Sequence, residues 1–197
     1  MALFATSINT YICTIKTKPF NALLGETYEY VDDKYEFLSE QVSHHPPCTV
    51  YYCRSKFGWT QWKDTRGKVQ FNLKNLNIIP NFPWHVSFDN MGPNGVGDEL
   101  YEMTMPLMSA HNLIIGQTYL DLHGKCSVRN LTRNETCIIN FHKRSWSGAN
   151  AFNLSGEIRN AAGELAFKVE GNFSDKVYVI DCTGPEEVKE YYYQKFQ

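Results

Sequence analysis

Segments of strand length, rich in Tyr, Phe, Val, Ile and Thr, recur along the whole 197-residue chain and predict a β protein. Helical spacing of apolar residues is confined to a short piece near Leu3 to Ile8. Turn-forming residues separate many of the segments, at Asp32-Asp33, His123-Gly124, residues 160–163 and Ser174-Asp175. The predicted strands are 11–15, 27–31, 35–42, 49–53, 60–63, 69–73, 100–103, 114–122, 127–130, 136–141, 152–158, 166–173 and 177–180.

Several of these strands alternate between apolar and charged residues, as in Phe167-Lys168-Val169-Glu170, so one face of the sheet is expected to be packed and the other solvated. So many consecutive antiparallel strands curl into a barrel or split into a sandwich, and a wide barrel can hold a ligand inside. Residues 80–98, rich in Pro and Gly, read as a long loop, and the tail after Gly184-Pro185 reads as the start of a helix because its first residues are acidic.

Composition narrows the function classes. We read residues 1–197 as one domain, because 43% hydrophobic residues suffice for a core and no linker interrupts the chain. A net charge of -2 disfavours binding to nucleic acid, or to a membrane by charge alone. The six cysteines form no Cys-x-x-Cys pair, the first residues lack the basic leader and apolar run of a signal peptide, and no stretch approaches the ~20 apolar residues of a membrane-spanning helix. We therefore expect a cytoplasmic protein with reduced thiols.

The most unusual local feature is His44-His45-Pro46-Pro47. Two prolines remove two backbone donors and favour extended backbone before them, so a strand ladder must end here or lie at an edge. At such a rim two imidazoles could donate hydrogen bonds to a phosphate. The alternative is that one histidine packs and the other is solvated. A metal site is disfavoured because no third ligand stands at a recognised spacing.

A second constellation covers Lys18 to Glu26. Lys18 offers a positive charge and Asn21 a hydrogen-bond donor for a phosphate, between the backbone irregularities of Pro19 and Gly25. The alternative is a surface loop that tucks Phe20 and Leu23 into the core. Signatures of nucleophilic, nucleotide-binding or zinc-protease sites are absent from the sequence, so we predict no catalytic residues, no metal, no cofactor and no enzyme activity.

These strings resemble the ligand-binding domain of the oxysterol-binding proteins. The string from Glu40 to Pro47 matches the signature of that family in full, and residues 18–29 resemble its second hallmark except at Ala22, where proline is usual. Residues 111–116, 121–124 and 155–158 resemble the family's later strands. The sequence departs from the family at Phe71-Asn72-Leu73-Lys74-Asn75, where Phe-Trp-Gly-Lys-Ser is usual.

The resemblance implies a mainly β fold, an incomplete antiparallel barrel with a lipid-binding tunnel and short helices at its ends. By motif position, Lys18, Asn21, His44 and His45 correspond to residues that hold the phosphate of phosphatidylinositol 4-phosphate at the tunnel mouth. A sterol or phosphatidylserine is the implied exchange ligand, carried between membranes without chemistry. The implied location is the cytoplasm, with peripheral contact at organelle membranes and membrane contact sites.

The family domain usually begins before a residue equivalent to Met1, with a lid, and continues beyond Gln197 into helices. We therefore expect a truncated version of the domain. Without its lid, the apolar wall of a tunnel stays in contact with water, which costs several kcal/mol at ~25 cal/mol per Å² for a few hundred Å². The alternative function is a lipid-sensing or protein-interaction module that has no transfer activity.

Overall fold

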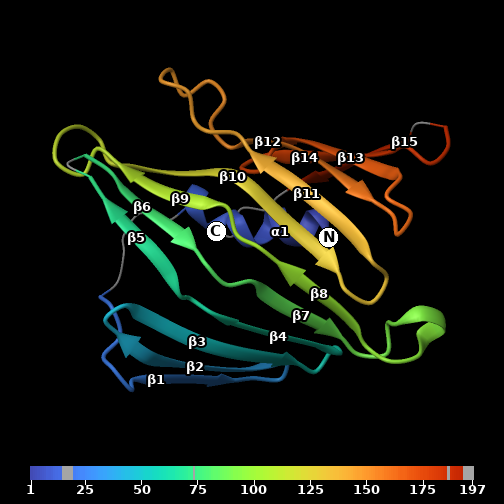
Figure 1. Cartoon of the computed structure of the whole chain (residues 1–197), viewed down its shortest axis with the longest axis horizontal. Coiled ribbons are helices and arrows are strands. Elements are labelled where there is room, and N and C mark those ends of the chain that lie inside the picture. The colour runs from blue at the N-terminus through green and yellow to red at the C-terminus, as the bar shows by residue number, and fades with distance from the viewer. Residues whose placement is uncertain (15–19, 73, 186, 193–197) are drawn as a thin grey trace.

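A computed structural model of the chain describes residues 1–14, 20–72, 74–185 and 187–192. Fifteen strands form one antiparallel sheet that curls without closing, with β1 at one end of the strand order and β15 at the other (Figure 1). The strands are β1 (Thr27–Val31), β2 (Tyr35–His44), β3 (Pro47–Ser55), β4 (Trp59–Asp64), β5 (Gly67–Phe71), β6 (Leu76–Pro80), β7 (Trp84–Phe88), β8 (Glu99–Met103), β9 (Leu107–His111), β10 (Tyr119–Asn130), β11 (Glu135–Phe141), β12 (Asn153–Arg159), β13 (Leu165–Asn172), β14 (Lys176–Asp181) and β15 (Glu187–Tyr192).

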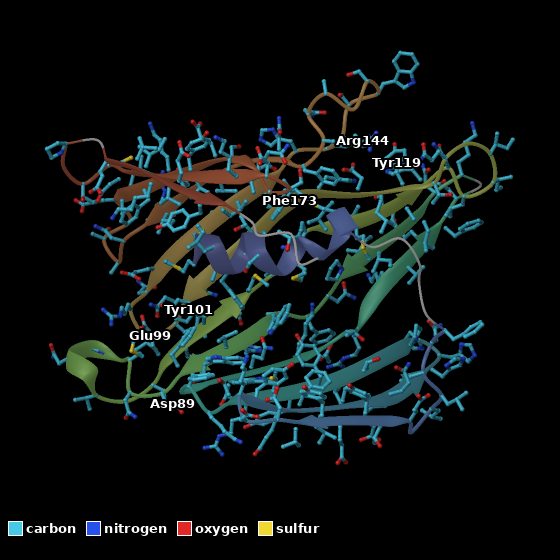
Figure 2. The ribbon with its side chains drawn as sticks, turned by 180° about the vertical axis from the view of Figure 1, so that it is seen from behind. Asp89, Glu99, Tyr101, Tyr119, Arg144 and Phe173 are labelled. Carbon is cyan, nitrogen blue, oxygen red and sulfur yellow. The ribbon has the colours of Figure 1, made fainter. Side chains whose placement is uncertain are left out.

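The predicted class, a mainly β and antiparallel incomplete barrel, is confirmed. Two short helices, α1 (Ala2–Asn9) and α2 (Tyr11–Thr14), and a 3-10 turn at Pro93–Gly95 complete the described elements. Figure 2, seen from behind, shows α1 lying across the concave side of the sheet. On the buried face of the helix, Thr6 Oγ1 donates to Ala2 O at 3.0 Å and Asn9 Nδ2 donates to Ala5 O at 2.7 Å, whereas Asn9 Oδ1 has no hydrogen-bond partner among the described residues.

The core lies between α1 and the strands that follow β7. It consists of Ala2, Ala5, Ile12, Met103, Leu122, Cys126, Val128, Cys137, Ile139, Phe141, Leu154, Val169, Phe173 and Val177. Phe173 packs edge-on against Phe141 and Phe152, with ring centroids 5.2 and 5.4 Å away. The concave side of the second half of the sheet is therefore filled by side chains and helix.

Sheet topology differs from a simple meander at one place. The main order runs β1-β2-β3-β4-β7-β8-β10 and on to β15, while β5, β6 and β9 form a branch that joins at the first half of β10. Residues 119–123 of β10 pair with β9, and from Gly124 onward β10 pairs with β11. The turn predicted at His123-Gly124 is wrong, because Gly124 adopts a positive φ of 98° inside one continuous strand.

Three further predictions are corrected, and two strands were missed. Residues 11–14 form α2 instead of a strand, because Ile12 faces the core beside α1. The tail expected to begin a helix forms β15, which pairs along its length with β14. The predicted loop 80–98 contains β7, which fills the place between β4 and β8. Strands β6 and β9 were not predicted, although each is paired on both sides.

Candidate functional site

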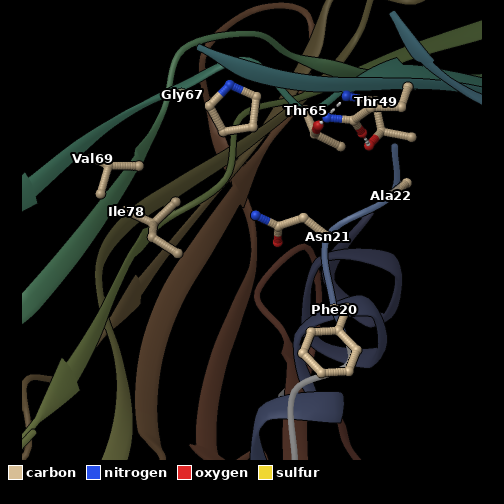
Figure 3. A pocket seen from close by; sticks show the side chains of 10 residues that line it. Phe20, Asn21, Ala22, Thr49, Thr65, Gly67, Val69 and Ile78 are labelled. Carbon is tan, nitrogen blue, oxygen red and sulfur yellow. Dashed lines mark hydrogen bonds between the residues drawn. The ribbon is translucent and has the colours of Figure 1, made fainter. Parts of the chain in front are cut away.

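An open cleft of about 360 Å³ lies where the segment after residue 19 meets two hairpins (Figure 3). One hairpin is β2–β3 and the other is β5–β6. The cleft is lined by Phe20, Asn21, Ala22, Gln41, Pro47, Thr49, Thr65, Gly67, Val69 and Ile78. Its lining therefore joins residues from both constellations that the sequence singled out, Asn21 from the segment Lys18 to Glu26 and Pro47 from the histidine string.

The loop 20–26 is held in place by strand β2. Gly25 N donates to Gln41 O at 2.8 Å, and Gln41 N donates to Glu26 O at 3.0 Å. Within the loop, the Glu26 carboxylate accepts a hydrogen bond from Leu23 N at 2.7 Å, and Gly25 adopts a positive φ of 78°. Because Gln41 precedes His44 by only three residues on the same strand, these bonds set Asn21 near the end of β2.

Gln41 also organises the floor of the cleft. Its amide nitrogen donates to Ser43 O at 2.7 Å, and its amide oxygen accepts from Thr49 Oγ1 at 2.5 Å. Thr49 N in turn donates to Thr65 Oγ1 at 2.8 Å. Sequence reasoning assigned no role to Gln41, Thr49 or Thr65, although the inward position of Gln41 follows from the alternation of β2.

The two histidines lie at the turn that connects β2 to β3. His44 is the last residue of β2 and pairs with Pro47, the first residue of β3, and the His45–Pro46 peptide between them is cis. The imidazole rings lie edge to face, with centroids 4.7 Å apart and planes at 71°. Both histidines are exposed, so the predicted rim position is confirmed and the alternative in which one histidine packs is wrong.

The other two predicted phosphate-binding residues are Lys18 and Asn21. Lys18 lies outside the described residues. Asn21 lines the cleft beside Pro47, which is the partner of His44 in the hairpin. The alternative that tucks Phe20 and Leu23 into the core is wrong, because both side chains are exposed, that of Phe20 completely.

An aromatic row crosses the concave side of the first strands. Tyr28, Phe37, Tyr51, Trp84 and Phe4 follow one another with ring centroids 6.1, 5.7, 5.7 and 5.9 Å apart. They come from β1, β2, β3, β7 and α1, so the row links the open edge of the sheet to the helix in its concavity. Such a surface suits the apolar body of a lipid.

Two polar groups are embedded beside this row. Lys63 Nζ lies 5.3 Å from the centroid of the Trp84 ring, and burial lowers the pKa of Lys63. Trp84 Nε1 is buried and makes no hydrogen bond with the described residues. Burial also raises the pKa of the neighbouring Tyr51 hydroxyl, which keeps that group neutral.

Two serine–histidine pairs lie within hydrogen-bond distance among the described residues, His142 Nε2 with Ser155 Oγ at 2.8 Å and the more buried pair Ser109 with His123. Ser109 Oγ lies 3.3 Å from His123 Nε2, but the serine donates its proton to Asn77 Oδ1 at 2.8 Å and is almost fully buried. A serine in this position has no proton to give the imidazole and no access to a substrate. Among the described residues, no group of three or more His, Cys, Asp or Glu could hold a metal ion, and no described helix has the length and apolarity to cross a bilayer.

Comparison with known proteins gives a consistent family assignment. A family model for "Oxysterol-binding protein" matches residues 1–195. Oxysterol-binding protein homolog 2 of Saccharomyces cerevisiae is 32% identical over 179 residues, which are 88% of this chain and 14% of that protein. Human oxysterol-binding protein-related protein 3 is 31% identical over 165 residues, which are 82% of this chain and 18% of that protein. The chain thus spans less than a fifth of the length of either relative.

Solved structures agree with this assignment. The crystal structure of the Osh1 ORD domain in complex with cholesterol is similar with a TM-score of 0.79 at 28% identity, covering 96% of this chain and 44% of that one. The Osh3 ORD of Saccharomyces cerevisiae, solved in complex with PI(4)P, has a TM-score of 0.71 at 22% identity, covering 89% of this chain and 47% of that one. The second likeness concerns the fold alone.

Proposed function

This chain belongs to the oxysterol-binding protein family, and on that premise we propose that it binds a lipid and carries it between membranes. The phosphate of phosphatidylinositol 4-phosphate binds at the rim, to Lys18, Asn21, His44 and His45. A sterol or phosphatidylserine is the exchange ligand, bound along the concave aromatic row. The protein acts in the cytoplasm, in peripheral contact with organelle membranes, and releases both lipids chemically unchanged.

One observation carries this proposal: the hydrogen bonds between Gly25, Glu26 and Gln41 hold the loop 20–26 against strand β2, which ends at His44 beside the equally exposed His45. Exposed imidazoles can donate hydrogen bonds to phosphate oxygens, most strongly when protonated, and an asparagine amide adds a neutral donor. Lys18 enters the set through its motif position and contributes a point charge. The likeness to the Osh1 domain solved with cholesterol supports a sterol as the second ligand.

The test is extraction of phosphatidylinositol 4-phosphate from liposomes by the parent chain and by a His44→Ala/His45→Ala variant. Charged hydrogen bonds contribute ~1.5–3 kcal/mol each, so we expect extraction to weaken at least tenfold. The matched control is Asp33→Ala/Lys34→Ala, which changes two exposed residues at the opposite end of β2. Equal extraction by the histidine variant and the parent would refute the assignment of the rim.

A second candidate function, an interaction module without transfer, is favoured by a hollow on the convex face. This hollow of about 360 Å³ is lined in part by the apolar side chains of Leu38, Tyr52 and Trp62 and by the acidic residues Glu40 and Asp64. Native mass spectrometry of the purified chain distinguishes the two functions. A copurifying lipid supports carriage, whereas a stable oligomer free of lipid supports the interaction module.

A further inference from the structure

Two neighbouring turns at one corner of the sheet expose apolar side chains. Phe71 ends β5, and Leu113, Ile114 and Ile115 lie in the loop between β9 and β10, where Ile115 is 85% exposed. Leu113 N donates to Lys74 O at 3.2 Å and so ties the two turns together. Figure 1 shows both turns at the same corner. We call Phe71, Lys74, Leu113, Ile114 and Ile115 the docking tip.

Hydrogen bonds within the loop between β9 and β10 hold its apolar side chains in their exposed positions. Asn112 Nδ2 donates to Gln117 O at 3.1 Å, and Thr118 Oγ1 donates to Asn112 O at 3.2 Å. Asn112 and Gly116 both adopt positive φ, which reverses the chain at each end of the apolar run. The loop thus uses its polar groups to close on itself and presents three consecutive apolar side chains to the outside.

A third turn nearby also exposes a large apolar side chain. Trp146, at the end of the loop between β11 and β12, is completely exposed. Two contacts tie the base of this loop to the start of β10: Arg144 N donates to Asp121 Oδ2 at 3.2 Å, and the guanidinium lies 4.5 Å from the Tyr119 ring centroid. Figure 2 shows Arg144 and Tyr119 side by side below that loop.

The ionisable side chains on the turns themselves are basic, and the acidic Asp121 lies at the base of the third turn, where it accepts the hydrogen bond from Arg144 N. The sequences 67–80, 104–120 and 142–151 contain no Asp or Glu, and they carry Lys68, Lys74, Lys143 and Arg144. Apolar tips that protrude beside cations fit a soft anionic surface, in which Ile and Trp enter the interface and Lys contacts lipid phosphates. A protein partner would instead need a separate hollow for each protruding turn.

From this arrangement we infer that the docking tip, with Trp146, inserts into the surface of a membrane that contains anionic lipid. The hairpin β5–β6 connects this surface to the cleft, because Val69 and Ile78 line the cleft and Phe71 lies at the tip. Membrane docking therefore sets the cleft beside the bilayer. The role of docking in lipid transfer rests on the proposed function. The binding of the docking tip to a membrane does not depend on that function.

The experiment is co-flotation of the chain with vesicles of phosphatidylcholine, with and without phosphatidylserine. We expect binding mainly to the vesicles that contain phosphatidylserine. Ile114→Ser/Ile115→Ser should weaken it at least tenfold, since each fully buried Ile contributes ~1.5–3 kcal/mol. Lys74→Gln should weaken it about fivefold, since one cation near an anionic surface contributes ~1 kcal/mol, and only on the anionic vesicles.

The matched control is Met91→Ser/Val96→Ser. It also removes two exposed apolar side chains, from the turn before β8 at the opposite end of the sheet. Equal flotation of the tip variant and this control would overturn the inference. So would a change of oligomeric state in the tip variant without a change in flotation, because the tip would then contact a second copy of the chain.

Failure of docking and failure of the proposed function can be told apart. Binding of a soluble short-chain phosphatidylinositol 4-phosphate, measured without vesicles, should be unchanged in the tip variant and weakened in His44→Ala/His45→Ala. Flotation with phosphatidylserine vesicles should show the reverse. Loss of short-chain lipid binding in the tip variant would contradict the separation of the two surfaces.

Discussion

Glu99 connects several side chains at the start of β8. Its carboxylate pairs with Arg133 Nε at 2.7 Å and accepts hydrogen bonds from Asn130 Nδ2 at 2.5 Å and from the Tyr101 hydroxyl at 3.0 Å. Glu99 and Tyr101 lie together on one strand in Figure 2. Glu99 and Asn130 are buried, so the carboxylate is the acceptor that allows these donors to leave water.

We expect Glu99→Ala to lower the free energy of unfolding by ~1–3 kcal/mol, because the buried Asn130 amide loses its 2.5 Å acceptor and keeps only contacts of 3.3 and 3.4 Å to Tyr101 and Glu135. The matched control is Glu157→Ala, which removes a carboxylate that pairs with Arg159 at 2.8 Å on the surface. Exposed pairs contribute at most ~1 kcal/mol. Urea denaturation of both variants measures the difference, and equal losses would show that burial of the Glu99 network contributes nothing.

Two half-buried histidines predict how stability depends on pH. Burial lowers the pKa of both His111 and His123 below the usual 6.5. The unfolded chain therefore takes up these protons first as the pH falls, so their contribution to stability is present above 6.5 and is lost below it. Nearby Asp121 opposes this effect, and Lys143 reinforces it.

We expect the free energy of unfolding of the parent chain to fall between about pH 7.5 and about pH 5.5. A His111→Gln/His123→Gln variant should lose much of this slope, because glutamine does not titrate. Urea denaturation at the two pH values measures it. An equal slope in parent and variant would mean that other groups control the dependence.

At the scale of elements, close contacts between neighbouring strand backbones limit the size of the side chain that fits at a given strand position. A Cβ atom at Gly156 in β12 would lie 2.5 Å from Ile138 O and 3.0 Å from Ile139 Cα of the neighbouring β11. The two strands therefore approach each other in a way that only glycine permits. This contact belongs to the Ser155-Gly156-Glu157-Ile158 string that resembles the family.

Gly156→Ala should lower the free energy of unfolding by ~1–3 kcal/mol, because the backbone of β11 must move to admit the methyl group. Gly184→Ala is the matched control, since a Cβ there meets nothing within 4 Å. Its effect should stay within ~0.5 kcal/mol. Thermal denaturation of both variants tests the contact, and similar melting temperatures would contradict it.

At the scale of the whole molecule, ligand binding should stabilise the folded chain. A soluble short-chain phosphatidylinositol 4-phosphate at ~100 times its Kd should add ~2.7 kcal/mol to the free energy of unfolding. The same concentration should stabilise His44→Ala/His45→Ala much less, because that variant binds more weakly. Thermal shift measurements test this, and equal shifts would count against the rim as the site of the phosphate.

The local pattern of residues predicted most of the strand content and the place of the histidines. The bounds of β1 agree with the predicted 27–31, and the prolines after His45 predicted the rim position. Alternation and proline chemistry act within a few residues, so they can be read without the partner strands. The same reasoning missed Gln41, whose role depends on a loop fifteen or more residues earlier in the chain.

Where the structure departs from prediction, a distant partner decided the outcome. The tail is a strand because β14 offers it an open edge. Residues 11–14 form a helix because Ile12 meets the core beside α1. Strand β10 continues through Gly124 because β9 pairs with its first part and β11 with the rest. Residue types thus determined that the chain is an antiparallel β protein with two histidines at a strand end. The branched sheet, its open edges and the position of Asn21 near the β2–β3 turn were decided only by tertiary pairing. The free energy of that pairing exceeds the intrinsic helix or strand propensities of the residues.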